Sequence, residues 1–279
     1  MPRCRPNATK TDATDALGLA HLMRTGWFRQ AHVKTEGAYR LKLLLTHRRN
    51  LKRKFLDLEN AIRHSLKSFG VKLHKVSRGG FEQAVREACA EDALTAELMD
   101  CMLTARAALW RQYLKLHNLV VRLVARDELR RRFMAIPGVG PVTALTFSTA
   151  IDDPKRFRRS RDVAAYFGLT SRRWQSGTSI DVQGRSSKAG DPEVRRALYE
   201  AASAMLTRYK GKTALKSCGQ KIAKRCHRKG VVAVARKLAV VMHATWVDGT
   251  FYCGDPATRA ADVSARAATK DKKLLGAYA

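Results

Sequence analysis

The sequence has few acidic side chains for its length. Asp and Glu number 24 against 54 Lys and Arg among 279 residues, which gives a formal net charge of +30. Such an excess of positive charge indicates a polyanionic partner, and nucleic acid is the commonest one. A structural RNA-binding protein would share this balance. The hydrophobic content of 45% indicates a folded chain rather than a disordered basic tail.

The cysteines lack the spacing of a metal or disulfide framework. No two of the six lie two to four positions apart, and the eight histidines form no ligand spacing with them. The sequence therefore predicts no zinc site, and the cysteines are interpreted as reduced thiols of a cytosolic protein.

Long apolar runs are also missing. The most apolar stretch, residues 231–246, is interrupted by Arg236, Lys237 and His243, whereas a membrane span needs about 20 apolar residues. Arg3 and Arg5 are followed by no apolar segment, so no signal peptide is visible. We expect a soluble, cytoplasmic protein without a membrane partner.

Two long helices are expected in the first half of the chain. Apolar residues recur at steps of three and four over residues 38–69 and again over residues 92–126, which is the helical period. Gly70 and the pair Gly79-Gly80 separate them. The pattern predicts either an antiparallel coiled-coil hairpin with a dimer seam or the core of an ordinary helical bundle.

The second half predicts more helices and one small β-hairpin, over residues 172–175 and 178–182. The fold class is therefore mainly α. Before the hairpin, Pro137-Gly138-Val139-Gly140 resembles a helix-hairpin-helix turn, in which glycines let backbone N–H groups approach a phosphate. A plain helix–helix turn is the alternative.

Two carboxylates near the start could bind a metal ion. Asp12 and Asp15 lie three positions apart, so on a helix they share a face and could hold one Mg²⁺. The alternative is that Asp12 caps the helix and Asp15 interacts with its dipole.

A serine in a basic, glycine-bounded stretch is the other candidate. Ser187 lies within residues 184–190, directly ahead of the helix-start pair Asp191-Pro192. Serine is a poor nucleophile unless a base, a metal or a positive field assists it. Arg185 and Lys188 are the expected phosphate contacts.

No histidine or carboxylate stands where it would obviously act as the base for this serine. The structural alternative is that Ser186 and Ser187 form a hydroxyl-to-backbone turn before the helix. Spacing alone leaves both interpretations open.

A family resemblance bears on that choice. Several segments occur in one order between Thr9 and Tyr252, namely KTDATDA, IPGVGPVTAL, FRRSRDVAAYFGLT, GRSSKAGDPEVRRAL and ARKLAVVM. In this order they resemble the insertion-sequence transposases of the IS one-ten family. The resemblance implies a RuvC-like domain with a DEDD carboxylate set, a coiled-coil linker, and a transposase domain with a serine nucleophile. It also implies Mg²⁺, and a bridge RNA that pairs with donor and target DNA.

The motif match gives these residues roles. Asp12 and Asp15 correspond to the last two carboxylates of the DEDD set, as catalytic residues and metal ligands. Ser187, directly before Lys188, corresponds to the nucleophile, and Ser186 is the second choice. The expected nucleic-acid contacts are the side chains of Arg185, Lys188, Arg195 and Arg196 and the backbone of Gly138 and Gly140.

The chain departs from the family at its front. The first Asp and the Glu of the family's set lie on strands well before these positions, but only eleven residues precede Asp12 here. We therefore expect an N-terminally truncated transposase whose RNase H-like domain is mostly missing. Its metal site would be weak, because half of the protein ligands are absent, and the chain alone would cleave DNA inefficiently.

The expected domains are a RuvC-like remnant (1–35), a coiled-coil linker (36–130), a serine transposase domain (131–253) and a flexible tail (254–279). The expected function is DNA transposition by serine attack with RNA-guided target choice. The alternative is a catalytically inactive nucleic-acid-binding remnant. Expected partners are DNA, bridge RNA and a second copy joined through the coiled coil, at the bacterial nucleoid.

Overall fold

The structure is a computed structural model that describes residues 11–28, 31–74, 76–177 and 180–254. The chain divides into two units between Thr35 and Glu36. The described part is mainly α, as the sequence predicts, and contains one two-stranded sheet. All but one residue of the expected tail lies outside the described residues.

The described residues of the first unit form one helix, α1 (Asp12–Thr25). Its N-cap is Thr11 rather than Asp12. Thr11 and Thr14 form a capping box, in which each side chain accepts from the other's backbone N–H. The helix ends at Gly26, with φ 64°. None of its side chains is buried in the described structure, and Leu17 and Met23 are exposed.

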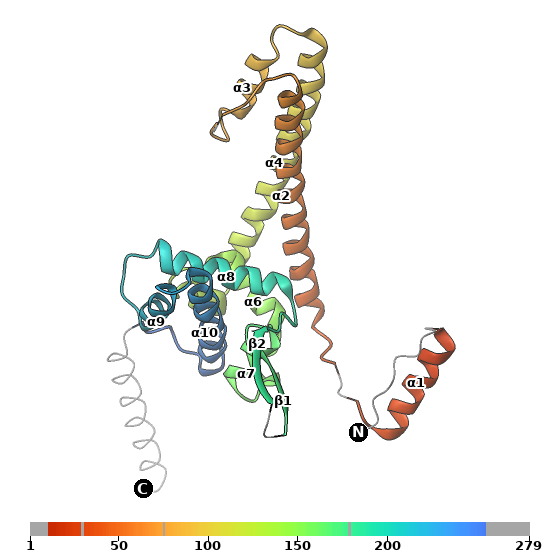
Figure 1. The fold of residues 1–279 in the computed structure, drawn as a ribbon, viewed down its shortest axis with the longest axis vertical. Helices are drawn as coiled ribbons and strands as arrows, with labels where there is room; N and C mark the ends of the chain where they lie inside the picture. Colours follow the sequence, from red (N-terminus) through yellow and green to blue (C-terminus); the bar gives the residue numbers. More distant parts are fainter. Residues whose placement is uncertain (1–10, 29–30, 75, 178–179, 255–279) are drawn as a thin grey trace. The chain divides into compact units, whose positions relative to one another are not determined.

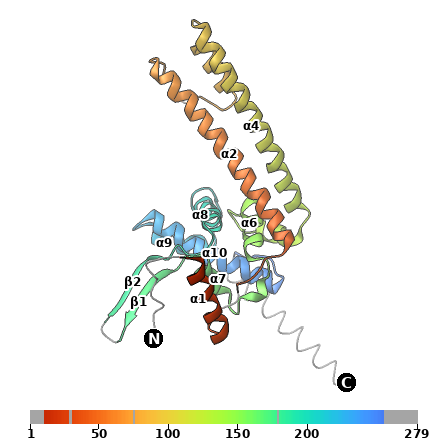
Figure 2. The same cartoon turned by 90° about the vertical axis from the view of Figure 1, so that its right-hand side faces the viewer.

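The second unit begins with two long helices, α2 (Glu36–Ser68) and α4 (Ala93–Ala125), joined through the short helix α3 (Phe81–Ala88). Figures 1 and 2 show α2 and α4 side by side and antiparallel. Ile62 and Leu66 of α2, Leu103 of α4, and Phe81 and Val85 of α3 share one buried cluster. The helical hairpin is confirmed; a coiled-coil dimer seam stays a prediction.

The buried face of α4 agrees with the predicted apolar stripe at Tyr113 and Val120 and differs from it in the first half of the helix. There the step of three and four from Leu98 includes Met102, which is only partly buried, whereas Met99 and Leu103 are buried and Leu98 is 54% exposed. Arg106 is buried as well. The broad apolar surface of α4 fits either register, and packing against α2 selects the one that buries Arg106.

Six helices form the body that follows the hairpin. They are α5 (Glu128–Met134), α6 (Pro141–Ile151), α7 (Ser160–Tyr166), α8 (Pro192–Thr207), α9 (Ala214–Ala223) and α10 (His227–Asp248), with a 3-10 turn at Pro154–Arg156. Helix α6 also packs against α4 through Leu145, Val120 and Val124, and Leu41 and Leu44 of α2 pack on the same cluster. The hairpin is therefore continuous with the body.

Helix α10 is the central helix of this body. By length and composition it could cross a membrane, and it is the one described helix of which this holds. Half of its apolar window is buried, and Val234, Leu238 and Met242 pack in the core with α7, α8 and α9. A core helix of this kind passes the same test, so its apolar sequence is explained by packing.

The sheet consists of β1 (Ser171–Ser176) and β2 (Ile180–Ser186), which run antiparallel with Trp174 opposite Val182. We call this strand pair the β-arm. Both strands are longer than predicted, and β2 continues to Ser186. The glycine-bounded turn expected over residues 184–190 is therefore wrong in its first half: Gly184, Arg185 and Ser186 belong to the strand.

Candidate functional site

Ser187 is the first residue beyond β2, in the serine loop, which we define as residues 187–191 between β2 and α8. Its backbone N–H donates to the Thr170 carbonyl oxygen at 2.9 Å, and the Lys188 N–H donates to the Gly168 carbonyl at 3.1 Å. The loop is thus fastened along the segment that follows α7.

Two glycines allow this close approach. Gly168 has φ 67°, and a Cβ there would lie 2.3 Å from the Ala189 nitrogen. Gly190 has φ 73°, and a Cβ there would lie 2.2 Å from the Tyr166 carbonyl oxygen. Both the left-handed backbone and the lack of space require glycine. A larger residue at either position would displace the serine loop.

Two guanidinium groups hold the main chain of the same loop. Arg195 Nη1 donates to the carbonyl oxygens of Ala189 at 2.6 Å and Gly190 at 3.0 Å. Arg172 Nη2 donates to the Ser187 carbonyl at 3.1 Å. The sequence identified Arg195 only as a nucleic-acid contact and did not identify Arg172 at all. Both have a structural task, which is to fix the backbone on either side of Lys188.

The Ser187 hydroxyl itself is nearly free of partners. It accepts one long hydrogen bond, 3.5 Å, from the Ala189 N–H, at the limit of such contacts. Among the described residues, no His, Asp or Glu side chain is hydrogen-bonded to it. The hydroxyl-to-backbone turn is therefore present only weakly, and it leaves the oxygen available. Ser186, in contrast, is paired with Ser171 in the sheet.

Lys188 adopts a backbone conformation that is unusual for a residue with a Cβ. Its φ is 55°, in the left-handed region, and among described non-glycine residues it shares a positive φ only with Asp152. Such a conformation persists where surrounding contacts impose it. Here it is imposed by the backbone hydrogen bonds of Ser187 and Lys188 to Thr170 and Gly168, and by the hydrogen bonds of Arg195 to the loop carbonyls. Lys188 is directly next to the candidate nucleophile.

The acidic groups beside the loop are already engaged. Asp191 caps α8 by accepting from the Glu193 N–H at 2.9 Å, as the sequence predicts, and Lys42 Nζ lies 3.4 Å from its other oxygen. Glu193 pairs with Arg49 of α2. These ion pairs bring α2 against the start of α8 and leave few carboxylates to offset the cations of the loop.

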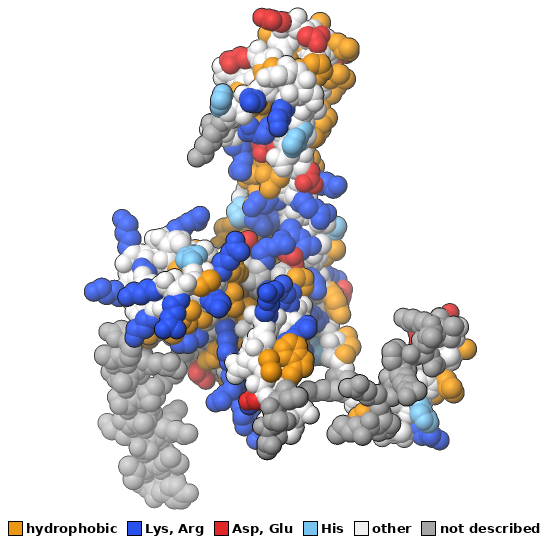
Figure 3. All heavy atoms as spheres, viewed as in Figure 1, with side chains coloured by type: hydrophobic (Ala, Val, Ile, Leu, Met, Phe, Trp, Pro, Cys, Tyr) orange, Lys and Arg blue, Asp and Glu red, His pale blue; other side chains and the backbone are white. Residues whose placement is uncertain are grey.

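Arg185 and Lys188 are exposed, and neither side chain has a hydrogen-bond or ion-pair partner among the described residues. Arg196 is exposed too, with a distant contact of 3.8 Å to Glu193. Figure 3 shows that Lys and Arg side chains cover much of this face of the second unit, with few Asp and Glu among them. The region suits a polyanion.

The predicted Pro-Gly-Val-Gly turn does join two helices, α5 and α6. Gly138 has φ 85°, and a Cβ there would lie 2.3 Å from the Ala201 carbonyl of α8. The close packing of this turn against α8 therefore explains why residue 138 is a glycine. Gly140 precedes Pro141 at the start of α6 without a side-chain cap, and a Cβ there would meet nothing within 4 Å.

Asp12 and Asp15 lie in the first turn of α1, both exposed, in the other unit. Among the described residues, no group of three or more His, Cys, Asp or Glu side chains could hold a metal ion. Two exposed carboxylates do not make a complete Mg²⁺ site. Asp12 and Asp15 therefore share the first turn of α1 as predicted, and the described residues do not complete a metal site around them.

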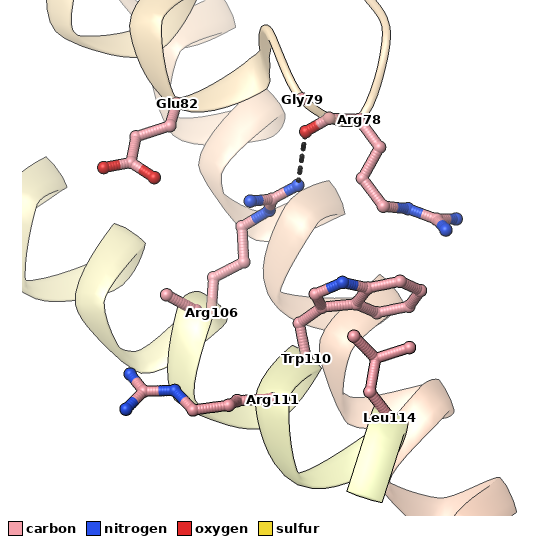
Figure 4. A pocket seen from close by; sticks show the side chains of 8 residues that line it. Arg78, Gly79, Glu82, Arg106, Trp110, Arg111 and Leu114 are labelled. Atoms are coloured by element: carbon pink, nitrogen blue, oxygen red, sulfur yellow. Dashed lines mark hydrogen bonds between the residues drawn. The ribbon is translucent and has the colours of Figure 1, made fainter. Parts of the chain in front are cut away.

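A cavity of about 510 Å³ lies on the helical hairpin (Figure 4). Its lining residues are far in sequence from the serine loop, and the sequence pattern did not predict it. Arg106 forms one wall, with Nη2 donating to the Arg78 carbonyl at 3.3 Å. The Arg78 guanidinium lies over the Trp110 ring at 4.3 Å, and Glu82 also lines the cavity. Arg106 is also bonded to Glu59, which accounts for its burial.

Comparison with known proteins gives two family matches. The model of the transposase IS116/IS110/IS902 family matches residues 130–218, which include Ser187. A transposase model of the DEDD type matches residues 1–70, which include Asp12 and Asp15.

Curated relatives agree with these matches. The chain is 28% identical over 254 residues to the transposase for insertion sequence element IS1111A of Coxiella burnetii, covering 88% of this chain and 70% of that protein. It is 30% identical over 203 residues to the putative transposase y4pF/y4sB of Sinorhizobium fredii, covering 71% and 51%. It is 31% identical over 138 residues to the pilin gene-inverting protein of Moraxella bovis, covering 46% and 41%.

These matches define the class as a transposase of insertion sequences. The chain belongs to the IS116/IS110/IS902 transposase family. It spans about half the length of the Sinorhizobium relative and less of the Moraxella one.

Proposed function

We propose that this chain is a DNA recombinase in which Ser187 Oγ attacks a DNA phosphodiester. One observation carries the proposal: the main chain around Ser187 is held by Gly168, Gly190 and Arg195, while its hydroxyl has only a 3.5 Å contact. A rigid backbone with a free hydroxyl is what a positioned nucleophile needs. The match of residues 130–218 to the transposase family supports the same role.

The proposed step conserves the phosphodiester. The Oγ–P bond forms, the bond from phosphorus to one deoxyribose oxygen breaks, and the released strand end leaves as a hydroxyl. The serine proton passes to solvent or to a group beyond the described residues, because no described base is bonded to Oγ. The hydroxyl of another DNA end then attacks this phosphoserine ester: the new O–P bond forms, the P–Oγ bond breaks, and Ser187 leaves as its hydroxyl, which completes strand exchange.

The cations next to Ser187 supply the field for this step. Arg185 and Lys188 are exposed and unpaired among the described residues, so they can bind the phosphate and stabilise the charge that develops on it. We assign Arg196, Arg195 and the backbone at Gly138 and Gly140 to further phosphate contacts. For Arg195 this role is secondary to its bonds with the loop carbonyls.

The DEDD type of the matching model points to a divalent metal such as Mg²⁺. Asp12 and Asp15 would supply two of its carboxylate ligands. Because the described residues offer no set of three ligands, no step of the proposal uses the metal. Guidance by a bridge RNA, assembly through the helical hairpin and a cytoplasmic location are part of the proposal and rest on the family resemblance.

Trapping of the covalent ester tests the nucleophile directly. The chain is incubated with guide RNA, Mg²⁺ and end-labelled DNA nicked near the crossover, so that the leaving strand diffuses away. We expect a labelled protein–DNA adduct on denaturing gels, its loss in Ser187→Ala, and its retention in Ser186→Ala. An undiminished adduct from Ser187→Ala would show that the nucleophile lies elsewhere.

A second candidate is a nucleic-acid-binding remnant without cleavage activity. The ligand set favours it, because no group of three or more candidate metal ligands occurs among the described residues, and a metal-assisted reaction needs more ligands than Asp12 and Asp15 supply. DNA binding without any adduct, across a range of Mg²⁺ concentrations and with a guide RNA that pairs correctly, would support this candidate over the recombinase.

A further inference from the structure

The β-arm extends away from the helical body (Figure 2), and none of its described side chains is buried. Every residue of β1 is exposed, and none of the described residues of the β-arm belongs to a hydrophobic cluster. A two-stranded sheet alone in water is only marginally stable. Because none of its described residues joins a hydrophobic cluster, the β-arm is expected to gain a partner.

The two faces of the β-arm differ in chemistry. Trp174 and Val182 are a cross-strand pair on one face. The Trp174 ring lies over Gly184, where a Cβ would be 2.3 Å from the ring, so the indole stiffens the ribbon across its weakest position. Arg173 and Gln183 pair on the opposite face, next to the pair Gln175 and Asp181.

This second face carries side chains that recognise base edges. Arginine binds guanine O6 and N7 with two hydrogen bonds, and glutamine binds adenine N6 and N7 in the same way. The major groove of B-DNA is wide enough to admit a two-stranded ribbon. Arg172 and Arg185 add positive charge to the ribbon, which Asp181 offsets only in part.

We propose that the β-arm enters the major groove of duplex DNA and reads base edges with Arg173, Gln175 and Gln183. This inference rests on the proposed function and deepens it. It assigns the chain a direct reading of DNA sequence in addition to any pairing by a guide RNA. The charge excess and the repeated Arg and Gln on one face identify DNA as the occupant.

Asp181 gives the β-arm a means of rejecting wrong sequences. Arg173 Nε and Nη2 donate to its two oxygens at 2.7 and 2.6 Å, with the same fork that would bind guanine. Binding of DNA must displace the Asp181 carboxylate from Arg173. Only a matching base replaces the two hydrogen bonds that are lost. Competition of this kind favours specificity over affinity.

The β-arm is connected to Ser187 without a flexible joint. Strand β2 ends at Ser186, Arg172 holds the Ser187 carbonyl, and the pairing register shifts between Ser171 and Arg173. Such irregularities redirect side chains and are common beside active sites. A β-arm docked in the groove therefore fixes which phosphate lies at Ser187.

Selection from a pool of DNA duplexes with a randomised centre tests the inference. The full chain, Gln175→Ala, Gln183→Ala and Asp181→Asn are compared, with Arg111→Ala on α4 as a control of matched exposure outside the β-arm. We expect the wild type to enrich a motif, and each Gln variant to lose about ten-fold of its preference at one position. Asp181→Asn should bind unselected duplexes more tightly and enrich the motif less.

Several outcomes would overturn this inference. The wild type could enrich no motif, or the Gln variants could enrich the same motif as the wild type. Stronger competition by single-stranded RNA than by duplex DNA would make the arm an RNA-binding element, and a changed oligomeric state in the variants would make it a protein interface. Circular dichroism checks that each variant is folded.

Failure of the proposed nucleophile is distinguishable from failure of the β-arm. Ser187→Ala retains the whole ribbon, so it should enrich the wild-type motif even though it forms no adduct. A normal motif with an adduct that survives Ser187→Ala would reject the nucleophile alone. A lost motif in Gln183→Ala is independent of whether any strand is cleaved.

Discussion

Gly190 lies directly against the backbone of Tyr166. A Cβ at residue 190 would come within 2.2 Å of the Tyr166 carbonyl oxygen, and the φ of 73° is itself unfavourable for other residues. The end of α7 and the end of the serine loop therefore touch through their main chains alone. The position of Ser187 depends on this contact.

Substitution of Gly190 by alanine should abolish adduct formation and lower the melting temperature. The change combines left-handed strain of about 1 kcal/mol with a collision that only a backbone shift can relieve. Gly177 provides the matched control: its φ is 56°, but a Cβ there meets nothing within 4 Å. Gly177→Ala should be destabilised only by the strain energy, and its adduct yield should stay that of the wild type.

Equal effects of the two alanine substitutions on melting temperature and adduct yield would contradict this explanation. The collision would then contribute nothing, and the contact between Gly190 and Tyr166 would not position Ser187.

Arg195 and Arg196 should separate positioning from binding. Arg195→Ala removes donors to the carbonyls of Ala189 and Gly190, and hydrogen bonds from charged groups contribute about 1.5–3 kcal/mol. We expect a slower rate of adduct formation with little change in DNA affinity. Arg196→Ala should instead weaken DNA binding and reduce its salt dependence by about one counterion, with a normal rate at saturating DNA.

The two variants are compared by anisotropy titration at several salt concentrations and by single-turnover trapping. If Arg195→Ala changed only the affinity, its bonds to the loop would be irrelevant to the reaction and its role would be phosphate binding.

The elements that local chemistry specifies were predictable from the sequence. Asp191 followed by Pro192 predicts the start of α8, and Asp191 does cap it, because an N-cap depends only on its own helix. The periodic pattern likewise predicts α2 and α4. The Pro-Gly-Val-Gly turn predicts a joint between helices, although its contact with α8 was not foreseen.

Contacts between distant segments were not predictable. Gly168 and Gly190 are required by backbone contacts across about twenty residues, which no local pattern records. From the sequence of α4 alone, Arg106 would be predicted on the surface. Its burial depends on the ion pair with Glu59, which lies 47 positions earlier in the chain. The continuation of β2 to Ser186 depends on pairing with Ser171, so its end could not be read from β2 alone.

Arg106 should be essential to the stability of the helical hairpin. Its side chain is 7% exposed and pairs with Glu59, which is 17% exposed. Its guanidinium also lies over the rings of Phe55 and Phe81 at 4.9 and 4.6 Å. Arg106→Ala leaves the Glu59 carboxylate without its partner, and breaking such a buried pair costs about 3–5 kcal/mol. Urea denaturation measures the loss.

The double variant Arg106→Met, Glu59→Leu tests the cause. Replacing both charges with apolar groups removes the unpaired charge, so we expect it to be much more stable than Arg106→Ala. Arg111→Ala, at an exposed residue five positions further along α4 that lines the same cavity, should change stability by less than about 0.5 kcal/mol. A double variant as unstable as Arg106→Ala would mean that packing, rather than charge pairing, dominates.

The hairpin should lose stability in mild acid through His117. Burial, together with the nearby charges of Arg48 and Lys52, lowers the pKa of His117 below its usual 6.5. Its Nδ1 accepts from Arg48 Nε at 3.2 Å, so the folded protein holds the neutral ring. The unfolded chain then binds the proton more readily. Stability from this group is complete above about pH 6.5 and falls as the pH drops toward the folded pKa.

Denaturation midpoints at pH 7.5, 6.5 and 5.5 measure this effect. The wild type should lose stability between the upper and lower values, and His117→Gln should lose less, because its amide oxygen can accept from Arg48 at every pH. His64→Gln, at an exposed histidine of α2, is the control for general charge effects. An unchanged pH dependence in His117→Gln would assign the acid sensitivity to other groups, since only the removal of this imidazole distinguishes the two chains.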